Sequence, residues 1–197
     1  MTKIIVMNGP PDCGKDEAIS FLKRQFGVHP FSFKTELFKL TQTLFCVTEA
    51  QWNSWYTREG KELPRPELGG KSCRQALIYV SEMVVKPSFG KDWFGKVEAH
   101  KLQLLASEGL IAACSDGGFN SEIEPLVEAF GASNVHIVRI YREGRTFAGD
   151  SRSWIDTKSV PFTNYWGVEN NGGLNEYWNE LYWVYHEIVT PGYSKTP

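Results

Sequence analysis

The pattern of apolar residues near the N-terminus predicts a buried strand followed by an amphipathic helix. Residues Lys3 to Asn8 are almost continuously apolar, as expected of a strand covered on both faces. The helix that follows should begin near Lys15 and end at Gly27, because glycine adopts the left-handed conformation that closes many helices. Its apolar positions recur at helical spacing and should pack on the sheet: Ala18, Ile19, Leu22 and Phe26.

Strand-like and helix-like segments alternate along the rest of the chain. Further strands are predicted at Pro30–Phe33, Leu110–Cys114, Asn134–Tyr141 and Tyr165–Glu169. Helices are predicted at Thr35–Phe45, at Ser72–Val85, at Trp93–Ser107 with Asp92 as its cap, from a capping box at Ser121–Glu124 to Phe130, and at Leu174–Ile188. Strands that alternate with helices form parallel sheets, which bind ligands at the carboxyl ends of their strands. The predicted fold class is therefore α/β.

Two segments interrupt this alternation. Residues 49–91 are rich in tryptophan and are broken by Pro64, Pro66 and the pair Gly69-Gly70. This block is too long for a simple crossover, so we interpret it as an inserted region that covers the substrate. Residues 142–158 are polar, carry several arginines and have weak periodicity, which is typical of a mobile loop.

Composition and charge argue against several classes of protein. The formal net charge is −2 and no long basic run is present, so we expect no nucleic-acid partner. No apolar stretch approaches the roughly 20 residues that span a bilayer, so we expect no membrane partner. The 4 cysteines lack metal-ligand spacing, as expected of reduced thiols in a cytoplasmic protein. The aromatic-rich C-terminal helix could supply the face of a homodimer.

The segment from Gly9 to Asp16, between the first strand and its helix, has the G-x-x-x-x-G-K pattern of a phosphate-binding loop. Its glycines let backbone N–H groups turn inward as an anion nest, and Lys15 adds an ammonium for the β- and γ-phosphates. A plain turn is the alternative, but the flanking strand and helix are the context that the motif requires. The residues predicted to bind the phosphates of ATP are Gly9, Asp12, Cys13, Gly14, Lys15, Asp16 and Glu17.

Two aspartates are placed to organise the magnesium ion that accompanies ATP. Asp16 stands where this loop usually carries a Ser or Thr whose hydroxyl binds magnesium, and Asp116 follows the apolar strand Leu110–Cys114. Each has a structural alternative. Asp16 would also be favourable with the helix dipole alone, and Asp116 could cap a helix or a turn before Gly117-Gly118.

Arginines cluster after the fourth predicted strand, at Arg142, Arg145 and Arg152. In a kinase, arginines on a closing lid neutralise the migrating phosphoryl group and exclude water. We favour Arg142 as the catalytic arginine beside Lys15, because it is nearest to the strand end. The alternative is a solvated basic loop whose charges pair with Glu143 and Asp150.

The acceptor should bind over the inserted block, and Asp116 and Arg152 are also predicted to bind it. Arg74 opens a predicted helix and could bind a monophosphate with both arms of its guanidinium. Phe33 and Trp93 could form the faces of a slot for a base, with Lys34 near the acceptor phosphate. Aromatic residues in such positions are more often part of the core, so this alternative stays open.

Taken in order, these segments resemble the phage-type deoxynucleoside monophosphate kinases, small P-loop enzymes of the nucleotide-kinase group. In that family aspartate also follows Gly-Lys directly, so Asp16 agrees with the family although it departs from the general motif. The resemblance runs from about residue 3 to residue 185 and is sparse between residues 38 and 71. It rests on Gly9 to Asp16, Ser32-Phe33, Arg74, Phe89-Gly90-Lys91-Asp92-Trp93, Ser115-Asp116 with Phe119 and Glu122, Gly149-Asp150-Ser151-Arg152, and Asn170-Asn171-Gly172.

The resemblance implies a three-layer P-loop NTPase fold with a five-stranded parallel sheet in the order 2-3-1-4-5. It implies one kinase domain over residues 1–197, with an NMP-binding insertion over about 34–92 and a lid over about 142–158. The implied reaction is ATP + dNMP → ADP + dNDP with Mg²⁺, in the cytoplasm, and in that of an infected host cell if the protein is phage-encoded. No general base is required, because the acceptor phosphate is already an anionic nucleophile.

One position departs from the family pattern. Where the family commonly reads Asp-Val-Arg-Phe, this chain has Asp116-Gly117-Gly118-Phe119, so another residue must supply that cation, or none does. Two other functions stay open: a P-loop kinase of another small metabolite, and a non-catalytic nucleotide-binding switch. The switch is the weaker hypothesis, because the Asn-Lys-x-Asp base reader of guanine-type switches is absent from the sequence.

Overall fold

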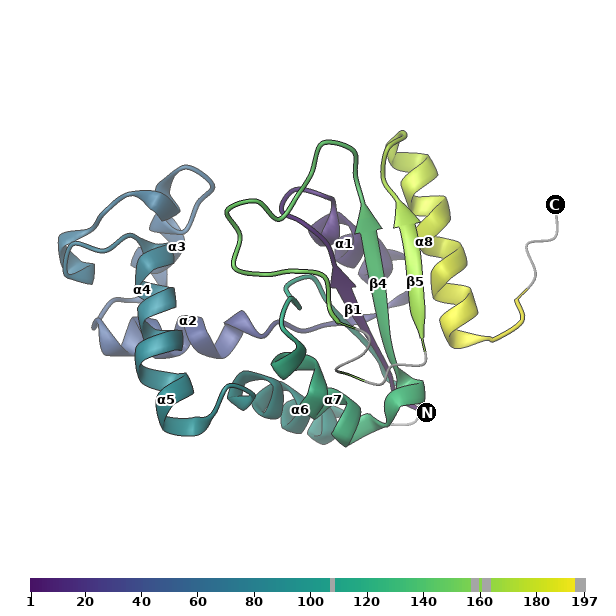
Figure 1. Cartoon of the computed structure of the whole chain (residues 1–197), viewed down its shortest axis with the longest axis horizontal. Helices are drawn as coiled ribbons and strands as arrows, with labels where there is room; N and C mark the ends of the chain where they lie inside the picture. Colours follow the sequence, from purple (N-terminus) through teal and green to yellow (C-terminus); the bar gives the residue numbers. More distant parts are fainter. Residues whose placement is uncertain (107–108, 157–159, 161–163, 194–197) are drawn as a thin grey trace. The chain divides into compact units, whose positions relative to one another are not determined.

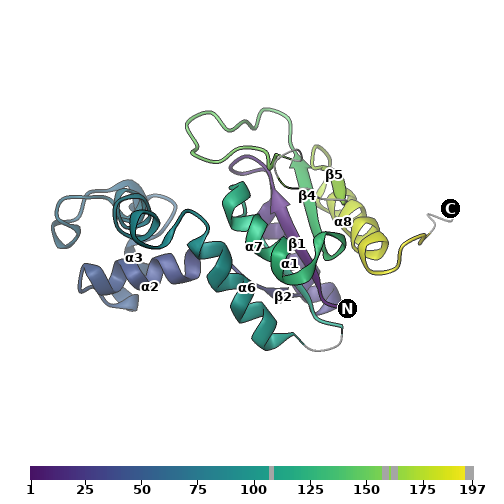
Figure 2. The ribbon, with the colours of Figure 1, turned by 60° about the horizontal axis from the view of Figure 1, so that its bottom comes forward.

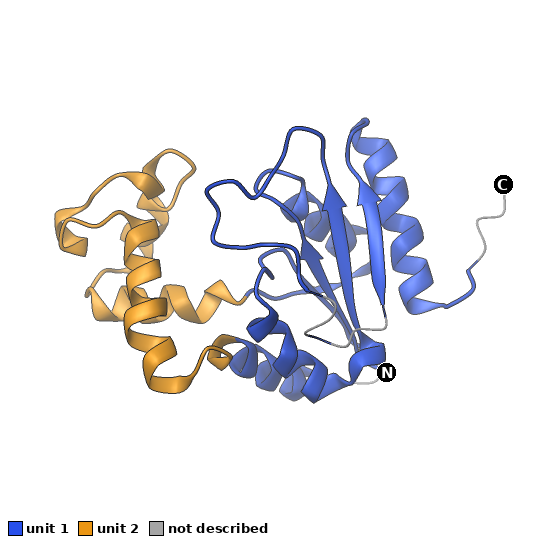
Figure 3. Cartoon of the chain, in the orientation of Figure 1, with its two compact units in different colours: residues 1–32, 95–197 blue, residues 33–94 orange. Residues whose placement is uncertain are grey.

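The computed structural model describes residues 1–106, 109–156, 160 and 164–193 of the chain. The chain forms two compact units, Met1–Ser32 with Gly95–Pro197, and Phe33–Phe94 (Figure 3). The second unit is inserted between two parts of the first, over nearly the residues predicted for the acceptor-binding insertion. The predicted helix end at residue 107 and lid residues 157 and 158 lie outside the described residues.

The first unit contains a five-stranded, all-parallel sheet with the predicted strand order β2-β3-β1-β4-β5. Figure 1 shows β1, β4 and β5 side by side in this sheet. The central strand β1 pairs with β3 and β4, and Val6 lies opposite Cys114 on one side and Ile137 on the other. The strands are β1 (Lys3–Asn8), β2 (His29–Pro30), β3 (Ile111–Cys114), β4 (Val135–Tyr141) and β5 (Tyr165–Glu169).

Helices cover both faces of the sheet, which confirms the predicted three-layer arrangement. Helices α1 (Lys15–Phe26) and α8 (Leu174–Val189) pack on the face to which Ile5 and Met7 point. Helix α7 (Asn120–Phe130) contacts β1 and β4 on the other face, and Figure 2 shows α7 and α8 on opposite sides of these strands. Helix α6 (Trp93–Leu105) lies against α7, since a Cβ at Gly95 would be 2.5 Å from the Glu122 carbonyl oxygen.

Two predicted boundaries were wrong. Strand β2 ends at Pro30, and Phe33 is the N-terminal cap of helix α2 rather than a strand residue. Proline has no N–H to donate to a ladder, and beyond it the Phe31 N–H donates to the Ala113 carbonyl. Helix α7 starts at Asn120, and the carboxylate that caps its first turn is that of Glu122 rather than the predicted Ser121–Glu124 box.

The second unit is mostly helical, although the sequence pattern over residues 49–91 looked irregular. Capping boxes that the sequence analysis missed start two of its helices, one from Thr48 with Gln51 and one from Ser72 with Gln75. Its core is built around Trp52, which is fully buried. Its elements are α2 (Lys34–Leu44), α3 (Glu49–Trp55), the 3₁₀ turns η1 (Gly60–Glu62) and η2 (Pro66–Leu68), α4 (Cys73–Tyr79), η3 (Val80–Val85) and α5 (Lys86–Phe89).

The predicted helix Ser72–Val85 is not a single α-helix. It is α-helical to Tyr79, widens into π-helix over Val80–Val85 and returns to α-helix in α5. Such π-helical stretches are rare and are frequently found at functional sites. The apolar periodicity that predicted the helix does not distinguish the two hydrogen-bonding patterns.

Candidate phosphate-binding site

The loop between β1 and α1 has the backbone conformations that a phosphate cradle needs. Asp12 and Gly14 lie in the left-handed region, with φ of 59° and 110°. Gly14 has no room for a side chain, because a Cβ would be 2.4 Å from Asn170 Nδ2. A Cβ on Gly9 would be 2.7 Å from the carbonyl oxygen of Ile140. Both glycines of the motif are therefore required for steric reasons.

The Lys15 side chain is folded across this loop and is 8% exposed. Its Nζ donates hydrogen bonds to the carbonyl oxygens of Gly9 at 2.7 Å and Pro10 at 2.6 Å, and lies 3.7 Å from Cys13 Sγ. Burial lowers the pKa of Lys15, the neighbouring Cys13 opposes that shift, and the Arg152 cation adds to it. Phosphate oxygens can replace the two carbonyls, so the ammonium is poised to bind an anion in the loop.

Two side chains from the end of β5 and the start of α8 hold the back of the loop. Asn170 Nδ2 donates to the Cys13 carbonyl at 2.8 Å, and the Tyr177 hydroxyl donates to the Gly14 carbonyl at 3.0 Å. Within a trans peptide the C=O and the N–H point in opposite directions. These bonds therefore turn the Gly14 N–H away from Asn170 and the Lys15 N–H away from Tyr177, as an anion nest requires.

The first turn of α1 is also held by α8. Trp178 Nε1 donates to Glu17 Oε1 at 2.9 Å, and the Trp178 ring stacks on Phe21 with centroids 5.7 Å apart. The Glu17 carboxylate thus helps to hold the two helices together, and the contact of Glu17 with phosphate stays a prediction. Sequence reasoning missed the roles of Asn170 and Tyr177, and its only signal was the family-like segment that contains Asn170.

Two of the predicted lid arginines lie over the phosphate loop at Asp12. Arg142 directly follows β4, and its Nη1 donates to the Asp12 carbonyl oxygen at 3.3 Å. Arg145 Nη1 lies 3.7 Å from Asp12 Oδ2, in an ion pair whose partners are both about half exposed. The structure therefore brings Arg142, the predicted catalytic arginine, to the same loop as Lys15.

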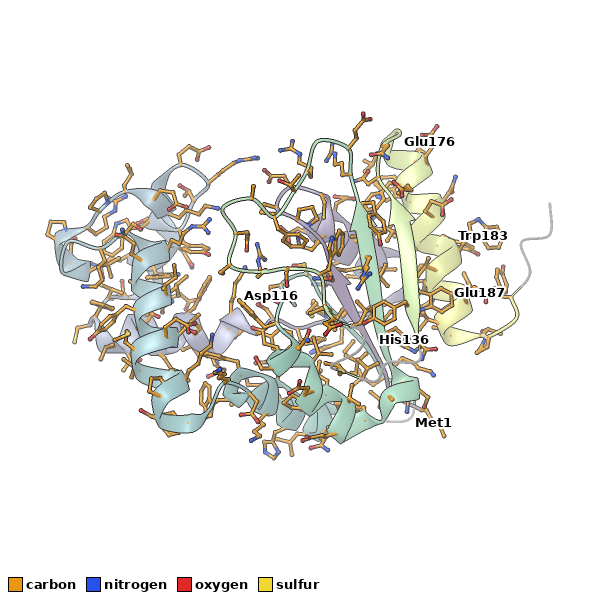
Figure 4. The ribbon with its side chains drawn as sticks, viewed as in Figure 1. Met1, Asp116, His136, Glu176, Trp183 and Glu187 are labelled. Atoms are coloured by element: carbon orange, nitrogen blue, oxygen red, sulfur yellow. The ribbon has the colours of Figure 1, made fainter. Side chains whose placement is uncertain are left out.

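Asp116 lies just beyond the carboxyl end of β3 and is 7% exposed (labelled in Figure 4). Its Oδ2 accepts a 2.7 Å hydrogen bond from the hydroxyl of Ser32, which comes shortly after β2. The carboxyl ends of neighbouring strands β1, β2, β3 and β4 thus supply Lys15, Ser32, Asp116 and Arg142. This is the edge at which parallel α/β sheets bind ligands.

The third arginine, Arg152, is held by a carboxylate of its own segment. Its Nε and Nη2 donate to the two oxygens of Asp150 at 2.9 and 2.7 Å, the pairing foreseen in the alternative interpretation of these arginines. This hydrogen bonding raises the pKa of Arg152, burial opposes the shift, and the charges of Asp150, Asp116 and Glu122 add to it. Arg152 therefore belongs electrostatically to the same edge of the sheet.

The second half of the predicted lid is anchored to the sheet. We call residues 150–156 the strap. Asn8, at the end of β1, donates from Nδ2 to the Ser153 carbonyl at 3.1 Å and accepts at Oδ1 from the Ile155 N–H at 3.0 Å. Arg139 Nη2 donates to the Ile155 carbonyl at 2.7 Å, and the Ile155 side chain is fully buried. The strap is thus fixed at the ends of β1 and β4, unlike the exposed residues 142–146.

The magnesium prediction can be tested against the donors in this unit. Asp16 is exposed beside Lys15, and Asp116 is buried at the next strand end. Among the described residues, no group of three or more His, Cys, Asp or Glu side chains could hold a metal by itself. Mg²⁺ bound with a nucleotide needs only one or two carboxylates, because phosphates and water fill the other positions. The donor set therefore fits magnesium delivered with ATP.

The remaining predicted site residues, Phe33, Lys34, Arg74 and Trp93, belong to the second unit. Phe33 is buried at the start of α2. Arg74 Nε donates to Glu62 at 2.7 Å, with both side chains about half exposed. Trp93 packs edge-on to Phe94 with ring centroids 5.0 Å apart. The assignment of these residues to the acceptor stays a prediction.

No protein-family model and no curated protein matches the sequence. Solved structures do match. The fold is similar to that of a dephospho-CoA kinase from Campylobacter jejuni, with a TM-score of 0.54 and 15% identity over 96% of this chain and 98% of that chain. The chain has the fold of P-loop kinases. A gluconokinase from Sinorhizobium meliloti 1021 is also similar, with a TM-score of 0.44 and 12% identity over 95% of this chain and 93% of that one.

At this level of identity the likeness establishes the P-loop kinase fold and not a substrate. Within the part of the chain that the structure describes, no helix combines the length and the apolar character needed to cross a bilayer. Because the fold alone does not identify a substrate, the function is argued from the chemistry of the site.

Proposed function

We propose that this protein transfers the γ-phosphoryl group of ATP to a deoxynucleoside monophosphate, giving ADP and a deoxynucleoside diphosphate. The observation that carries the proposal is the convergence of cations and oriented amides on one loop. Lys15 Nζ is bonded to the loop carbonyls, the Arg142 guanidinium is bonded to Asp12, and Asn170 and Tyr177 hold the loop from behind. Phosphoryl transfer needs mainly such positioning and charge neutralisation.

The proposed reaction asks for no proton transfer at the start. A phosphate oxygen of the acceptor forms a bond to the γ-phosphorus of ATP, and the bond from that phosphorus to the bridging oxygen of ADP breaks. The Lys15 ammonium and the loop N–H groups stabilise the transferred group on one side. Arg142, next to the loop at Asp12, neutralises charge that spreads over the equatorial oxygens.

Magnesium supplied with ATP would neutralise the β- and γ-phosphates in this scheme. Asp16 and Asp116 are the residues that would hold it, directly or through its water molecules. Asp16 follows Lys15 in the first turn of α1, and the Ser32 hydroxyl fixes the orientation of the Asp116 carboxylate.

For the acceptor we propose the residues of the second unit, on the basis of the family resemblance. Arg74 would bind the acceptor phosphate with both arms of its guanidinium, releasing Glu62, its present partner. Phe33 and Trp93 would flank the base, and Lys34 would lie near the acceptor phosphate. Asp116 and Arg152, which belong to the first unit, are also proposed to bind the acceptor.

A kinase of another small metabolite is the second candidate, and the fold shared with a dephospho-CoA kinase favours it. An alcohol acceptor would need a general base, and Asp116 is the buried carboxylate at the strand ends. Asp116→Asn should then lower transfer to an alcohol by about 10²-fold or more. Transfer to a monophosphate needs no base and should be affected less.

A panel of acceptors tests both candidates. The purified protein is incubated with ATP and Mg²⁺ and with each ribo- and deoxynucleoside monophosphate, in parallel with small alcohols including sugar and nucleoside hydroxyls, and ADP formation is followed. We expect deoxynucleoside monophosphates to give the highest kcat/KM. Turnover with alcohols alone would replace the first proposal by the second. No turnover with any acceptor would contradict both.

A further inference from the structure

The Arg152 side chain fills the space that a side chain at position 118 would need. A Cβ on Gly118 would lie 2.5 Å from Arg152 Cγ, 2.6 Å from Cδ and 2.8 Å from Cβ. These are atoms in the stem of the side chain, not its far end, so a small rotation of the tip would not relieve the contact. The stem of Arg152 therefore runs directly over the backbone of Gly118, through the volume that any other residue at position 118 would fill.

The Arg152 side chain has little freedom to move out of that volume. At its root, the Arg152 N–H donates to Asp150 Oδ1 at 2.9 Å, and the next residue of the strap is bonded to Asn8. At its tip, Asp150 binds both Nε and Nη2. The side chain is 20% exposed. Glycine at 118 is thus what lets the strap place a cation beside the β3–α7 turn.

The charge of the Arg152 guanidinium interacts with charged groups of the candidate site. It contributes, after burial, to the lowered pKa of Lys15, and Asp116 contributes to the raised pKa of Arg152. Asp150 accepts from Nε and Nη2, and the Nη1 N–H groups are the donors of this guanidinium that the Asp150 pair does not use. The positive charges of Lys15 and Arg152 repel each other at this edge of the sheet. A phosphate bound near both would relieve that repulsion.

We propose that Arg152 binds the phosphate of the acceptor, and that Gly118 is the residue that makes this possible. This inference rests on the proposed function. Asp150 holds the fork in place before the ligand arrives, so little rotamer entropy is lost when the phosphate binds. The guanidinium then comes from the strap, through the volume that a side chain at position 118 would fill.

Kinetics of two single variants test this assignment. Arg152→Ala should raise KM for the acceptor by about 10- to 100-fold, the typical effect of losing a charge-assisted contact, with KM for ATP nearly unchanged. Gly118→Ala should act in the same direction, because its methyl group displaces the Arg152 stem. Gly173→Ala is the matched control, since Gly173 has an ordinary φ of −73° and a Cβ added there would meet no atom within 4 Å. Thermal melting checks that each variant is folded.

A double variant separates lost charge from lost structure. Gly118→Arg combined with Arg152→Ala supplies the guanidinium from the turn instead of the strap. Its KM for the acceptor should be at least about tenfold lower than that of the Arg152→Ala single variant. A double variant no better than Arg152→Ala, or a Gly118→Ala variant with the wild-type KM for the acceptor, would overturn the proposal.

Direct binding distinguishes this inference from the proposed function. Calorimetric titration of inorganic phosphate in the presence of MgADP needs no turnover. If the wild-type protein transfers no phosphoryl group, the proposed function fails, yet Arg152→Ala should still raise the Kd for phosphate about tenfold or more. An equal Kd for wild type and Arg152→Ala would refute the role of Arg152 whatever the activity.

Discussion

Lys15 both closes the phosphate loop and provides its charge. Its ammonium is buried and bonded to the carbonyls of Gly9 and Pro10, so the residue contributes to the loop even without a ligand. The same ammonium is the group that would move onto the β- and γ-phosphates. Removing it should therefore affect catalysis far more than folding.

Lys15→Ala should lower kcat by about 100-fold or more, because the transferred group loses its principal cation. The free energy of unfolding should fall by only about 1–3 kcal/mol, the cost of the lost hydrogen bonds. Initial rates of ADP formation and urea unfolding measure the two effects. Lys23→Ala, on the exposed side of the same helix, is the control and should change neither. Near-normal turnover of Lys15→Ala would end the assignment as a kinase.

Asp16 is the residue whose role is least constrained by its contacts, because its side chain is exposed in the first turn of α1. If the carboxylate holds magnesium, Asp16→Ser should raise the magnesium concentration for half-maximal rate by about tenfold. Rates at saturating ATP across a magnesium titration give this value, with Glu124→Gln as an exposed acidic control. Unchanged magnesium dependence would mean that Asp16 only interacts with the helix dipole.

The sequence predicted where Lys15, Asp116 and Arg142 lie, because each follows a strand of a parallel sheet and such strands end on one edge. It did not predict the contacts that hold them. Asn170 and Tyr177 reach the loop from far along the chain, and Arg152 reaches Gly118 from a segment without periodicity. Such long-range contacts depend on tertiary packing, which local patterns do not record.

Among the elements, α8 has a role beyond packing on the sheet. It meets the phosphate loop through Tyr177 and the first turn of α1 through Trp178, while its apolar stripe packs in the core. The periodicity of the sequence predicted the ends of this helix well, although Leu174, at its start, is exposed rather than packed. It did not reveal that a hydroxyl at the start of the helix orients a peptide of the loop.

Tyr177→Phe tests this role of α8. Loss of the hydrogen bond to the Gly14 carbonyl should loosen the Lys15 N–H and raise KM for ATP by about 3- to 10-fold, as expected for one neutral hydrogen bond. Tyr185→Phe, farther along the same helix, removes a hydroxyl from the core without touching the loop and is the matched control. Equal KM values for ATP in the two variants would show that Tyr177 is only a packing residue.

Element boundaries were harder to predict than the topology. The strand order follows from alternation and connectivity, which the whole chain specifies. The short strand β2, the π-helical stretch Val80–Val85 and the start of α7 depend on individual hydrogen bonds. Residues 49–91 looked irregular because their helices are short and lie around a separate core, centred on Trp52.

At the scale of the whole molecule, stability should depend on pH through a histidine in the sheet. His136, labelled in Figure 4, lies in β4, is 3% exposed and accepts at Nδ1 a 3.4 Å hydrogen bond from Trp166 Nε1. Its Nε2 is buried and has no hydrogen-bond partner among the described residues. Burial, and to a lesser extent the charge of Lys3, lowers the pKa of His136 from 6.5 to about 4.

The sign of the effect follows from which state binds the proton. Between pH 6.5 and about 4 the unfolded chain protonates this histidine and the folded chain does not. The contribution of His136 is therefore complete above pH 6.5 and is lost as the pH falls toward 4, by on the order of 2 kcal/mol. Urea unfolding across this range should show it as a difference between wild type and His136→Gln, which removes the titrating group and keeps an acceptor for Trp166. Carboxylates titrate in both proteins, so their contribution cancels, and parallel stability curves would show that His136 accepts a proton in the folded sheet at its ordinary pKa.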